Sequence, residues 1–283
     1  MFTRTRPLVS IRKEKGWCFI LRTIQKRRRR KRRLHILSGI LVFLTVAYCG
    51  IGCITYLSSR LTGCSIQPAR AKVNAILKET DTYPEELLDM LSRNPDMLDF
   101  VEGYPEKKGQ VFADTIGHVK KGEFPLLLQW DERWGYGNYG NNCIAVNGCA
   151  PTVISMVVAG LTGDNSITPY TVAQFADEHG YYVPGSGSSW SLISEGIGQF
   201  GLSSSELPLS KDSVLGALDS GMPVICSMRP GDFTTTGHFI VLVGTENGQI
   251  RVHDPNSKER SRQLWDYETL EHQINNLWAV SPL

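Results

Sequence analysis

One stretch of the chain restricts the possible folds more than any other. Residues 147–152 have the sequence Asn-Gly-Cys-Ala-Pro-Thr and lead into a largely apolar run, residues 153–158. Gly148 permits a tight turn, and Pro151 suits the first turn of a helix because its missing N–H would have no intrahelical partner there. The pattern predicts a turn followed by a buried helix. Cys149 is then at or just before the helix N-terminus.

The N-terminus of a helix favours a reactive cysteine. Free N–H groups and the positive end of the helix dipole stabilise a thiolate, which is the nucleophilic form of the side chain. The alternative is a structural role for Cys149, since free cysteines are among the most buried residues and usually behave as small apolar groups. The choice depends on what the rest of the chain supplies.

Two downstream segments supply the groups that a cysteine nucleophile needs. Residues 237–244 read Gly-His-Phe-Ile-Val-Leu-Val-Gly and residues 249–255 read Gln-Ile-Arg-Val-His-Asp-Pro, and both predict strands. A sulfur nucleophile requires an imidazole that takes its proton and a third group that orients the imidazole. We expect His238 in the first role and Asp254 in the second. His253 is a rival base, but neighbours in a strand face opposite ways, so it would not meet Asp254 directly.

The loop between these strands decides whether His238 and Asp254 share a face of the sheet. A two-residue loop at residues 247–248 would put Asp254 opposite Val241, and the two side chains would then point to opposite faces. A three-residue loop, residues 246–248, puts Asp254 on the face of His238. We predict this loop, or another of odd count, unless the strand is bulged.

A strongly basic segment precedes an uncharged one near the start of the chain. Residues 1–33 contain 14 Lys or Arg and one acidic residue, a balance of +13 in a chain whose formal net charge is +2. Residues 34–59 contain no Asp, Glu, Lys or Arg. As a helix with ~1.5 Å of rise per residue, this stretch reaches roughly 39 Å, enough to cross a hydrocarbon core of about 30 Å. The sequence therefore predicts one transmembrane helix.

The basic cluster also predicts the orientation of this helix. Because Lys and Arg accumulate on the cytoplasmic side, we expect the N-terminus in the cytoplasm and everything after Arg60 outside the cell. Because a predicted transmembrane helix follows it directly, the basic run 26–33 does not indicate nucleic-acid binding. A cleaved signal peptide is the alternative, although its apolar core is usually only about 7–15 residues long. Residues 61–64, Leu-Thr-Gly-Cys, resemble a bacterial lipidation site, which would also leave the domain outside and membrane-bound.

Two short helices are predicted beyond a stalk. Residues 84–91 and 95–101 each begin with proline, carry acidic residues in the first turn and show apolar residues at helical spacing. We expect them to pack against the domain that follows. That domain begins near residues 124–136, whose aromatic and glycine content predicts a packed, irregular strand.

Three polar residues stand out in this irregular segment. Gln129 is a candidate oxyanion-hole donor, acting with the backbone N–H of Cys149 on the developing negative oxygen. Asp131 and Arg133 are expected to form a structural ion pair.

The middle of the chain mixes helices with strands. Helices are predicted at residues 168–180, 190–200 and 213–220, and a buried strand containing Cys226 at residues 222–228. Residues 184–190 contain two glycines and end in Trp190. They form either a plain turn or a loop that approaches an extended substrate, with the indole as an apolar wall.

The cysteines do not indicate a disulfide framework or a metal site. Four of the seven lie beyond the membrane segment, and they are widely spaced: Cys64, Cys143, Cys149 and Cys226. Neither a Cys-x-x-Cys nor a His-Glu-x-x-His spacing is present. We expect neither a metal nor another cofactor.

Together the motifs resemble a known family. Cys149 in Gly-Cys-Ala-Pro-Thr, His238 in Gly-His-Phe-Ile-Val-Leu and Asp254 in Asp-Pro-Asn occur in the order found in papain-like cysteine peptidases of family thirty-nine, which process bacteriocin leaders. The resemblance covers the chain from about Phe124 to the C-terminus. It implies an α+β fold in which an N-terminal catalytic helix packs on an antiparallel sheet.

The resemblance also implies roles for the site residues. Cys149 is the expected nucleophile, His238 the general base and acid, and Asp254 the orienting group, with Asn256 as the alternative because papain-like enzymes can use an amide. In leader peptidases the oxyanion glutamine lies a few residues before the cysteine, so the assignment of Gln129 requires that it fold back. Leader peptidases are also cytoplasmic domains fused to an exporter, so double-glycine leader cleavage is not carried over.

These observations define four segments and one leading function. We expect a basic cytoplasmic tail (1–33), a transmembrane helix (34–59), a stalk with short helices (60–122) and a cysteine peptidase-like domain (123–283). The expected function is hydrolysis of peptide bonds in an extracellular peptide or protein. The alternatives are a cell-wall peptide amidohydrolase or transferase of the same fold, and a non-catalytic peptide-binding module.

Overall fold

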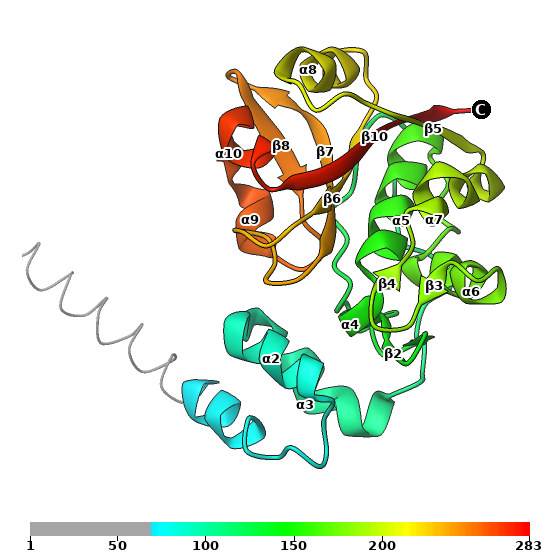
Figure 1. Ribbon diagram of the computed structural model, residues 1–283. Coiled ribbons are helices and arrows are strands. Elements are labelled where there is room, and N and C mark those ends of the chain that lie inside the picture. Colours follow the sequence, from blue (N-terminus) through cyan, green and yellow to red (C-terminus); the bar gives the residue numbers. More distant parts are fainter. Residues whose placement is uncertain (1–68) are drawn as a thin grey trace, which may run out of the picture. The chain divides into compact units, whose positions relative to one another are not determined.

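A single helix, α5 (Cys149–Thr162), lies against one face of a six-stranded antiparallel sheet in the computed structural model, which describes residues 69–283 (Figure 1). The basic tail, the expected membrane helix and Cys64 lie outside the described residues. Within residues 69–283, no helix combines the length and the apolar character needed to cross a membrane. The predicted α+β class is confirmed.

The sheet has the strand order β5-β10-β6-β7-β8-β9, and all neighbouring strands are antiparallel. Its strands are β5 (Leu202–Glu206), β6 (Val224–Met228), β7 (His238–Glu246), β8 (Gln249–His253), β9 (Leu264–Trp265) and β10 (Ile274–Pro282). The predicted strands at residues 222–228, 237–244 and 249–255 are thus β6, β7 and β8.

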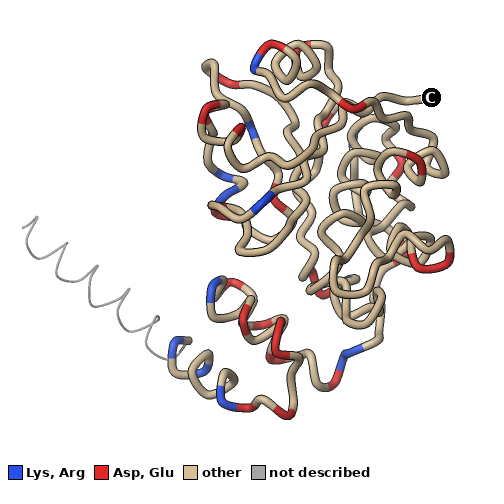
Figure 2. The backbone as a smooth tube through the Cα atoms, viewed as in Figure 1, with Lys and Arg blue, Asp and Glu red and all other residues tan. Residues whose placement is uncertain are grey.

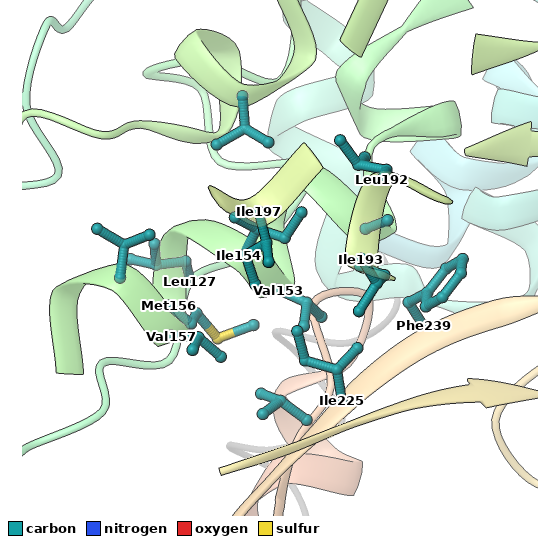
Figure 3. Packing of buried hydrophobic residues seen from close by; sticks show 14 of the residues in the cluster. Leu127, Val153, Ile154, Met156, Val157, Leu192, Ile193, Ile197, Ile225 and Phe239 are labelled. Carbon is teal, nitrogen blue, oxygen red and sulfur yellow. The ribbon is translucent and has the colours of Figure 1, made fainter. Parts of the chain in front are cut away.

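Helix α5 is apolar on all sides and is accordingly buried. It contains no charged residue (Figure 2), and every residue from Ala150 to Gly160 is buried. Val153 and Val157 belong to the same cluster as Ile225 of β6 and Phe239 of β7, with α7 residues close by (Figure 3). The far face of the sheet is covered by α8 (Lys211–Asp219) and α10 (Tyr267–Glu271).

The two predicted N-terminal helices are confirmed. They are α2 (Glu85–Arg93) and a short 3-10 turn, η1 (Pro95–Met97), that continues into α3 (Leu98–Lys107). Their apolar side chains share a core with Trp130, Tyr136 and Ala145. They therefore brace the stretch of chain that leads into α5, and residues 71–283 form one unit.

Residues 124–136 form turns and no strand, so the expected irregular strand is not present. The segment is nevertheless well anchored. Trp134 is fully buried and its indole N–H donates to the Leu128 carbonyl at 2.8 Å. The predicted ion pair is confirmed, with Arg133 Nη2 at 2.9 Å from Asp131 Oδ2.

The hairpin between β7 and β8 corrects the predicted loop. Glu246 pairs with Gln249, so the connection is the two-residue turn Asn247-Gly248, and the prediction of a three-residue loop is wrong. Both turn residues have positive φ, 54° and 80°. Two-residue turns of this kind are favoured because their twist matches that of the flanking strands.

A β-bulge brings the two predicted site residues back to one face. The register of β7 against β8 shifts between Leu242 and Gly244. Continuing the shifted register puts Asp254 opposite Ile240, and therefore on the face of His238. The β-bulge thus places both side chains on one face of the sheet, as the three-residue loop was expected to do.

The remaining elements are short. The helix predicted at 168–180 is α6 (Pro169–Glu178), which is capped by Thr168. The helix predicted at 190–200 is wrong as a single element, because glycines at 196 and 198 weaken it and it divides into α7 (Ser191–Ser194) and η2 (Gly196–Phe200). The other elements are β1 (Asn138–Tyr139), β2 (Asn142–Cys143), α4 (Ile144–Asn147), β3 (Tyr182–Val183), β4 (Gly187–Ser188) and α9 (Lys258–Arg262).

Candidate active site

Cys149 is the first residue of α5, as the Gly-Cys-Ala-Pro pattern predicts. Gly148 separates α4 from α5, and a Cβ at this position would lie 2.5 Å from the Ile144 carbonyl oxygen, so only glycine fits the junction. Thr152 Oγ1 donates to the Gly148 carbonyl at 2.7 Å and ties the first turn of α5 to it. The turn thereby holds Cys149 at the end of a rigid, buried helix.

Cys149 differs from the other two described cysteines in its exposure. Cys143 and Cys226 are buried, whereas Cys149 is half-buried. Burial raises the pKa of the Cys143 thiol to about 11. Burial also raises the pKa of the Cys226 thiol. Both thiols stay protonated and enclosed at neutral pH, which leaves Cys149 as the accessible sulfur of the described domain.

His238 opens β7 and connects Cys149 to Asp254. Its Nε2 lies 2.8 Å from Asp254 Oδ1, and only 8% of its surface is exposed. Because Nε2 is committed to Asp254, Nδ1 is the ring nitrogen available to Cys149, and Cys149 and His238 line the same cavity. The three side chains that the sequence singled out are therefore brought together, from α5, β7 and the end of β8.

The surroundings of His238 favour its protonated form. Burial alone would lower the pKa of the imidazole, but attraction to Asp254, the hydrogen bond to Asp254 and the interaction with Cys149 together raise that pKa to about 9. At neutral pH the ring is an imidazolium. It is a cation that can face a thiolate and can give up a proton.

Asp254 is fully buried and fully hydrogen-bonded. Besides the imidazole, Oδ1 accepts from the backbone N–H of Asn256 at 2.7 Å, while Oδ2 accepts from the Nε–H of Arg260. Burial opposes ionisation, but His238 and Arg260 together hold the pKa of the Asp254 carboxyl below its ordinary value. The carboxylate is ionised and fixed in orientation.

Arg260 is a functional candidate that the sequence reasoning missed. Ser257 caps α9 by accepting from the Arg260 backbone N–H at 3.2 Å, and this single turn returns the guanidinium to Asp254, six residues earlier. The Asp-Pro-Asn-Ser sequence before Lys258 is typical of a turn followed by a helix N-cap, and it could have predicted the short helix that carries Arg260. A carboxylate predicted to be buried also needs a second partner besides a histidine.

Gln129 folds back toward the catalytic helix, as its proposed role requires. Its backbone N–H donates to the Pro255 carbonyl at 2.8 Å, next to Asp254, and its side-chain Nε2 donates to the Ala145 carbonyl at 2.7 Å, just before Cys149. Nε2 also lies 3.4 Å from the Val146 carbonyl oxygen. Because the amide nitrogen carries two N–H groups, the bond to Ala145 uses one, and the other, which makes only this long contact, is the candidate donor to an oxyanion. This role stays a prediction.

The other histidines and Asn256 lie outside the triad. The imidazole bonded to Asp254 is that of His238 and not of His253, and burial lowers the pKa of His253 to about 4, so its ring is neutral. His179 bonds to the Phe175 carbonyl on α6, and His272 is exposed. Asn256 contributes its backbone N–H to Asp254, and its side-chain oxygen is buried without a hydrogen-bond partner among residues 69–283. The orienting group at His238 is Asp254.

The site opens into a cavity of about 450 Å³ that contains both Cys149 and His238. The β3–β4 hairpin lines one side: residues 184–186 form its turn, and Ser186, Gly187 and Ser188 border the cavity. Trp190 forms part of the wall and is 43% exposed, with its indole N–H donated to Ser227 Oγ at 3.1 Å. The cavity therefore has an apolar wall, glycine backbone and hydroxyl groups within reach of the sulfur.

Comparison with solved structures finds several chains that resemble this one distantly. The peptidase domain of Streptococcus ComA, a bi-functional ABC transporter involved in a quorum-sensing pathway, shares 18% identity at a TM-score of 0.38, covering 48% of this chain and 93% of that domain. A C39-like peptidase from Bacillus anthracis shares 15% identity at a TM-score of 0.31, covering 57% and 96%. The double-glycine motif protease of an AMS/PCAT transporter, in complex with a leader peptide, shares 14% identity at 0.28, covering 62% and 100%.

The curated proteins contain no match to the chain. A protein-family model, in contrast, matches residues 121–281, which is more than half of the chain and includes Cys149, His238 and Asp254. The chain belongs to the Peptidase_C39 like family.

Proposed function

We propose that the domain is a cysteine peptidase that hydrolyses peptide bonds through an acyl-enzyme, with Cys149 as nucleophile and His238 as general acid and base. One observation carries the proposal: Cys149, at the head of a buried helix, shares a cavity with an imidazole whose other nitrogen is held by a buried carboxylate. Family membership supports the same reaction class.

The geometry supports a two-step acyl transfer. The Cys149 thiolate attacks the peptide carbonyl carbon, and the backbone N–H of Cys149, with the second N–H of the Gln129 amide, stabilises the oxyanion. The Nδ1–H of His238 protonates the leaving amine as the C–N bond breaks. The neutral ring then takes a proton from water, the hydroxide attacks the thioester, and the sulfur leaves as thiolate beside a restored imidazolium.

The ion pairs of Asp254 support this assignment. Buried charges are tolerated when they are paired and hydrogen-bonded, and Asp254 has both the His238 imidazole and the Arg260 guanidinium as partners. Asp254 can therefore stay ionised while His238 carries its proton.

Replacement of Cys149 tests the nucleophile. We expect a peptidyl acyloxymethyl ketone to label the wild-type chain, and Cys149→Ala to abolish both labelling and cleavage of a proteome-derived peptide library followed by mass spectrometry. Cys143→Ala and Cys226→Ala are matched controls that remove buried thiols and should retain both signals. Equal labelling of the Cys149→Ala variant would reject Cys149 as the nucleophile.

The pKa of His238 predicts the alkaline side of the pH profile. As pH rises through about 9, the imidazolium loses the proton that the leaving amine needs, so kcat/KM on a library-selected peptide should fall there. Asp254→Asn removes the charge that raises this pKa while burial, which lowers it, remains. The alkaline limb should then move down by about one to three pH units.

Asp131→Asn is the control for this pH experiment, since Asp131 also pairs with a cation but lies outside the cavity. Its profile should match that of the wild type. An alkaline limb that does not move in Asp254→Asn would contradict the coupling of Asp254 to His238.

Arg260 is expected to act by positioning Asp254. Because Arg260 holds the pKa of Asp254 down, Arg260→Gln should move the acid limb of kcat/KM to higher pH, an effect that loss of packing alone would not cause. We expect kcat/KM to fall by roughly ten- to a hundredfold, as when an outer orienting partner is lost. Arg260→Lys, which keeps the charge, should recover part of the loss.

The matched control is Arg251→Gln, which breaks an exposed ion pair with Glu246 on the same hairpin. It should leave the pH profile unchanged. An acid limb at the wild-type position in Arg260→Gln would limit Arg260 to a structural role.

We further propose that residues 34–59 anchor the domain to the cell membrane as one helix, with the N-terminus in the cytoplasm and the peptidase domain outside. The uncharged length of this segment and the +13 balance of residues 1–33 support this.

In intact bacterial cells expressing the full chain with a tag at each end, added protease should remove the C-terminal tag and spare the N-terminal one. Deletion of residues 34–59 should release the chain from the membrane fraction. A C-terminal tag that is protected until the cells are lysed would reverse the proposed orientation.

A further inference from the structure

The cavity at Cys149 has an unbalanced set of charged residues. Among the described residues that line it, Arg229 and His238 are the basic ones, and none is Asp or Glu. The remaining polar groups are neutral: Ser186, Ser188, Ser227, Thr236 and Asn275. Since His238 is paired with Asp254, the charge of Arg229 is the one that the cavity leaves uncompensated.

Arg229 is fixed next to the imidazole by the sheet. Met228 pairs with His238 across β6 and β7, so Arg229 follows directly beyond that pair. Its backbone N–H donates to the Gln273 carbonyl at 2.9 Å, and its Nη2 donates to the Ile274 carbonyl at 2.6 Å, where β10 has a register shift. One end of the guanidinium is therefore tethered to backbone.

The other donors of this guanidinium have no acceptor among residues 69–283. Four other arginines of the domain each have a carboxylate within 4.0 Å: Arg93, Arg133, Arg251 and Arg260. Asp232, the acidic residue closest to Arg229 in sequence, instead accepts from Gln273 Nε2 at 2.8 Å. Arg229 is exposed and lines the cavity, with one end of its guanidinium anchored and its other donors unused. Such a group is suited to a carboxylate, which it binds through paired N–H groups.

We infer that Arg229 forms a carboxylate subsite, so that the preferred substrates are peptides with a carboxylate close to the scissile bond. The inference rests on the proposed peptidase function for its substrate, but the subsite itself depends only on the cavity. The carboxylate has two possible sources, the side chain of Asp or Glu and the free C-terminus of a short peptide. Both present the same group to Arg229.

Alkylation of the full chain tests the subsite without any substrate. Iodoacetate is an anion and iodoacetamide is its neutral counterpart, and both reach Cys149 through the same cavity. We expect Arg229→Gln to lower the ratio of their alkylation rates at Cys149 by roughly three- to thirtyfold, the order expected when one positive charge is removed from a partly solvated cavity. Arg229→Lys should keep most of the ratio. The control Arg262→Gln removes an exposed arginine outside the cavity and should keep all of it.

Matched peptides then identify the carboxylate. Internally quenched pairs that differ by Glu or Gln at each position around the cleaved bond, each with a free or amidated C-terminus, separate the two sources. A preference of at least about tenfold for one acidic form, lost in Arg229→Gln and kept in Arg229→Lys, supports the subsite. An unchanged alkylation ratio in Arg229→Gln overturns it. If Arg229→Gln lowers the alkylation ratio as expected but the chain cleaves none of the peptides, the peptidase function is rejected and the subsite is retained.

Discussion

The buried carboxylate of Asp254 is the interaction on which the arrangement of the site depends. A fully enclosed negative charge is tolerated only with partners, and Asp254 has them on every side: the His238 imidazole, the Arg260 guanidinium and the Asn256 backbone N–H. The backbone N–H of Asp254 donates to Ser261 Oγ at 2.9 Å. Satisfying this one group joins β7, β8 and α9, and the same contacts fix the imidazole ring in front of Cys149.

The rest of the fold presents the sulfur to that ring. Helix α5 is buried along most of its length, so its position against β6 and β7 is set by close packing rather than by surface charges. The N-terminal helices pack on the residues that lead into α5, and Gln129 links the chain beside Asp254 to the same place. A nucleophile and a base from distant parts of the sequence thus share one rigid frame.

Three predictions from the sequence differ from the structure: the irregular strand at residues 124–136, the three-residue loop and the single helix at residues 190–200. The turn at Asn247-Gly248 follows local backbone preference and has two residues, yet the requirement that His238 and Asp254 share a face is still met by the bulge near Leu242. The prediction that His238 and Asp254 share a face was right, but a β-bulge places them there and not a three-residue loop. Likewise, the predicted helix at residues 190–200 failed because two glycines within it weaken a continuous helix.

The sequence by itself determined the α+β class, the position of Cys149 at the head of a buried helix and the candidate roles of His238 and Asp254, because these depend on local periodicity, turn chemistry and the order of motifs. Only the tertiary structure decided that Arg260 is the second charged partner of the Asp254 carboxylate and that Gln129 donates an amide N–H to the Ala145 carbonyl. It also decided that Arg229 lines the cavity with unused N–H donors. These contacts join residues through the packing of separate elements or through one short capped turn. Which groups form these contacts depends on burial and charge balance in three dimensions. Residue spacing along the chain does not reveal them.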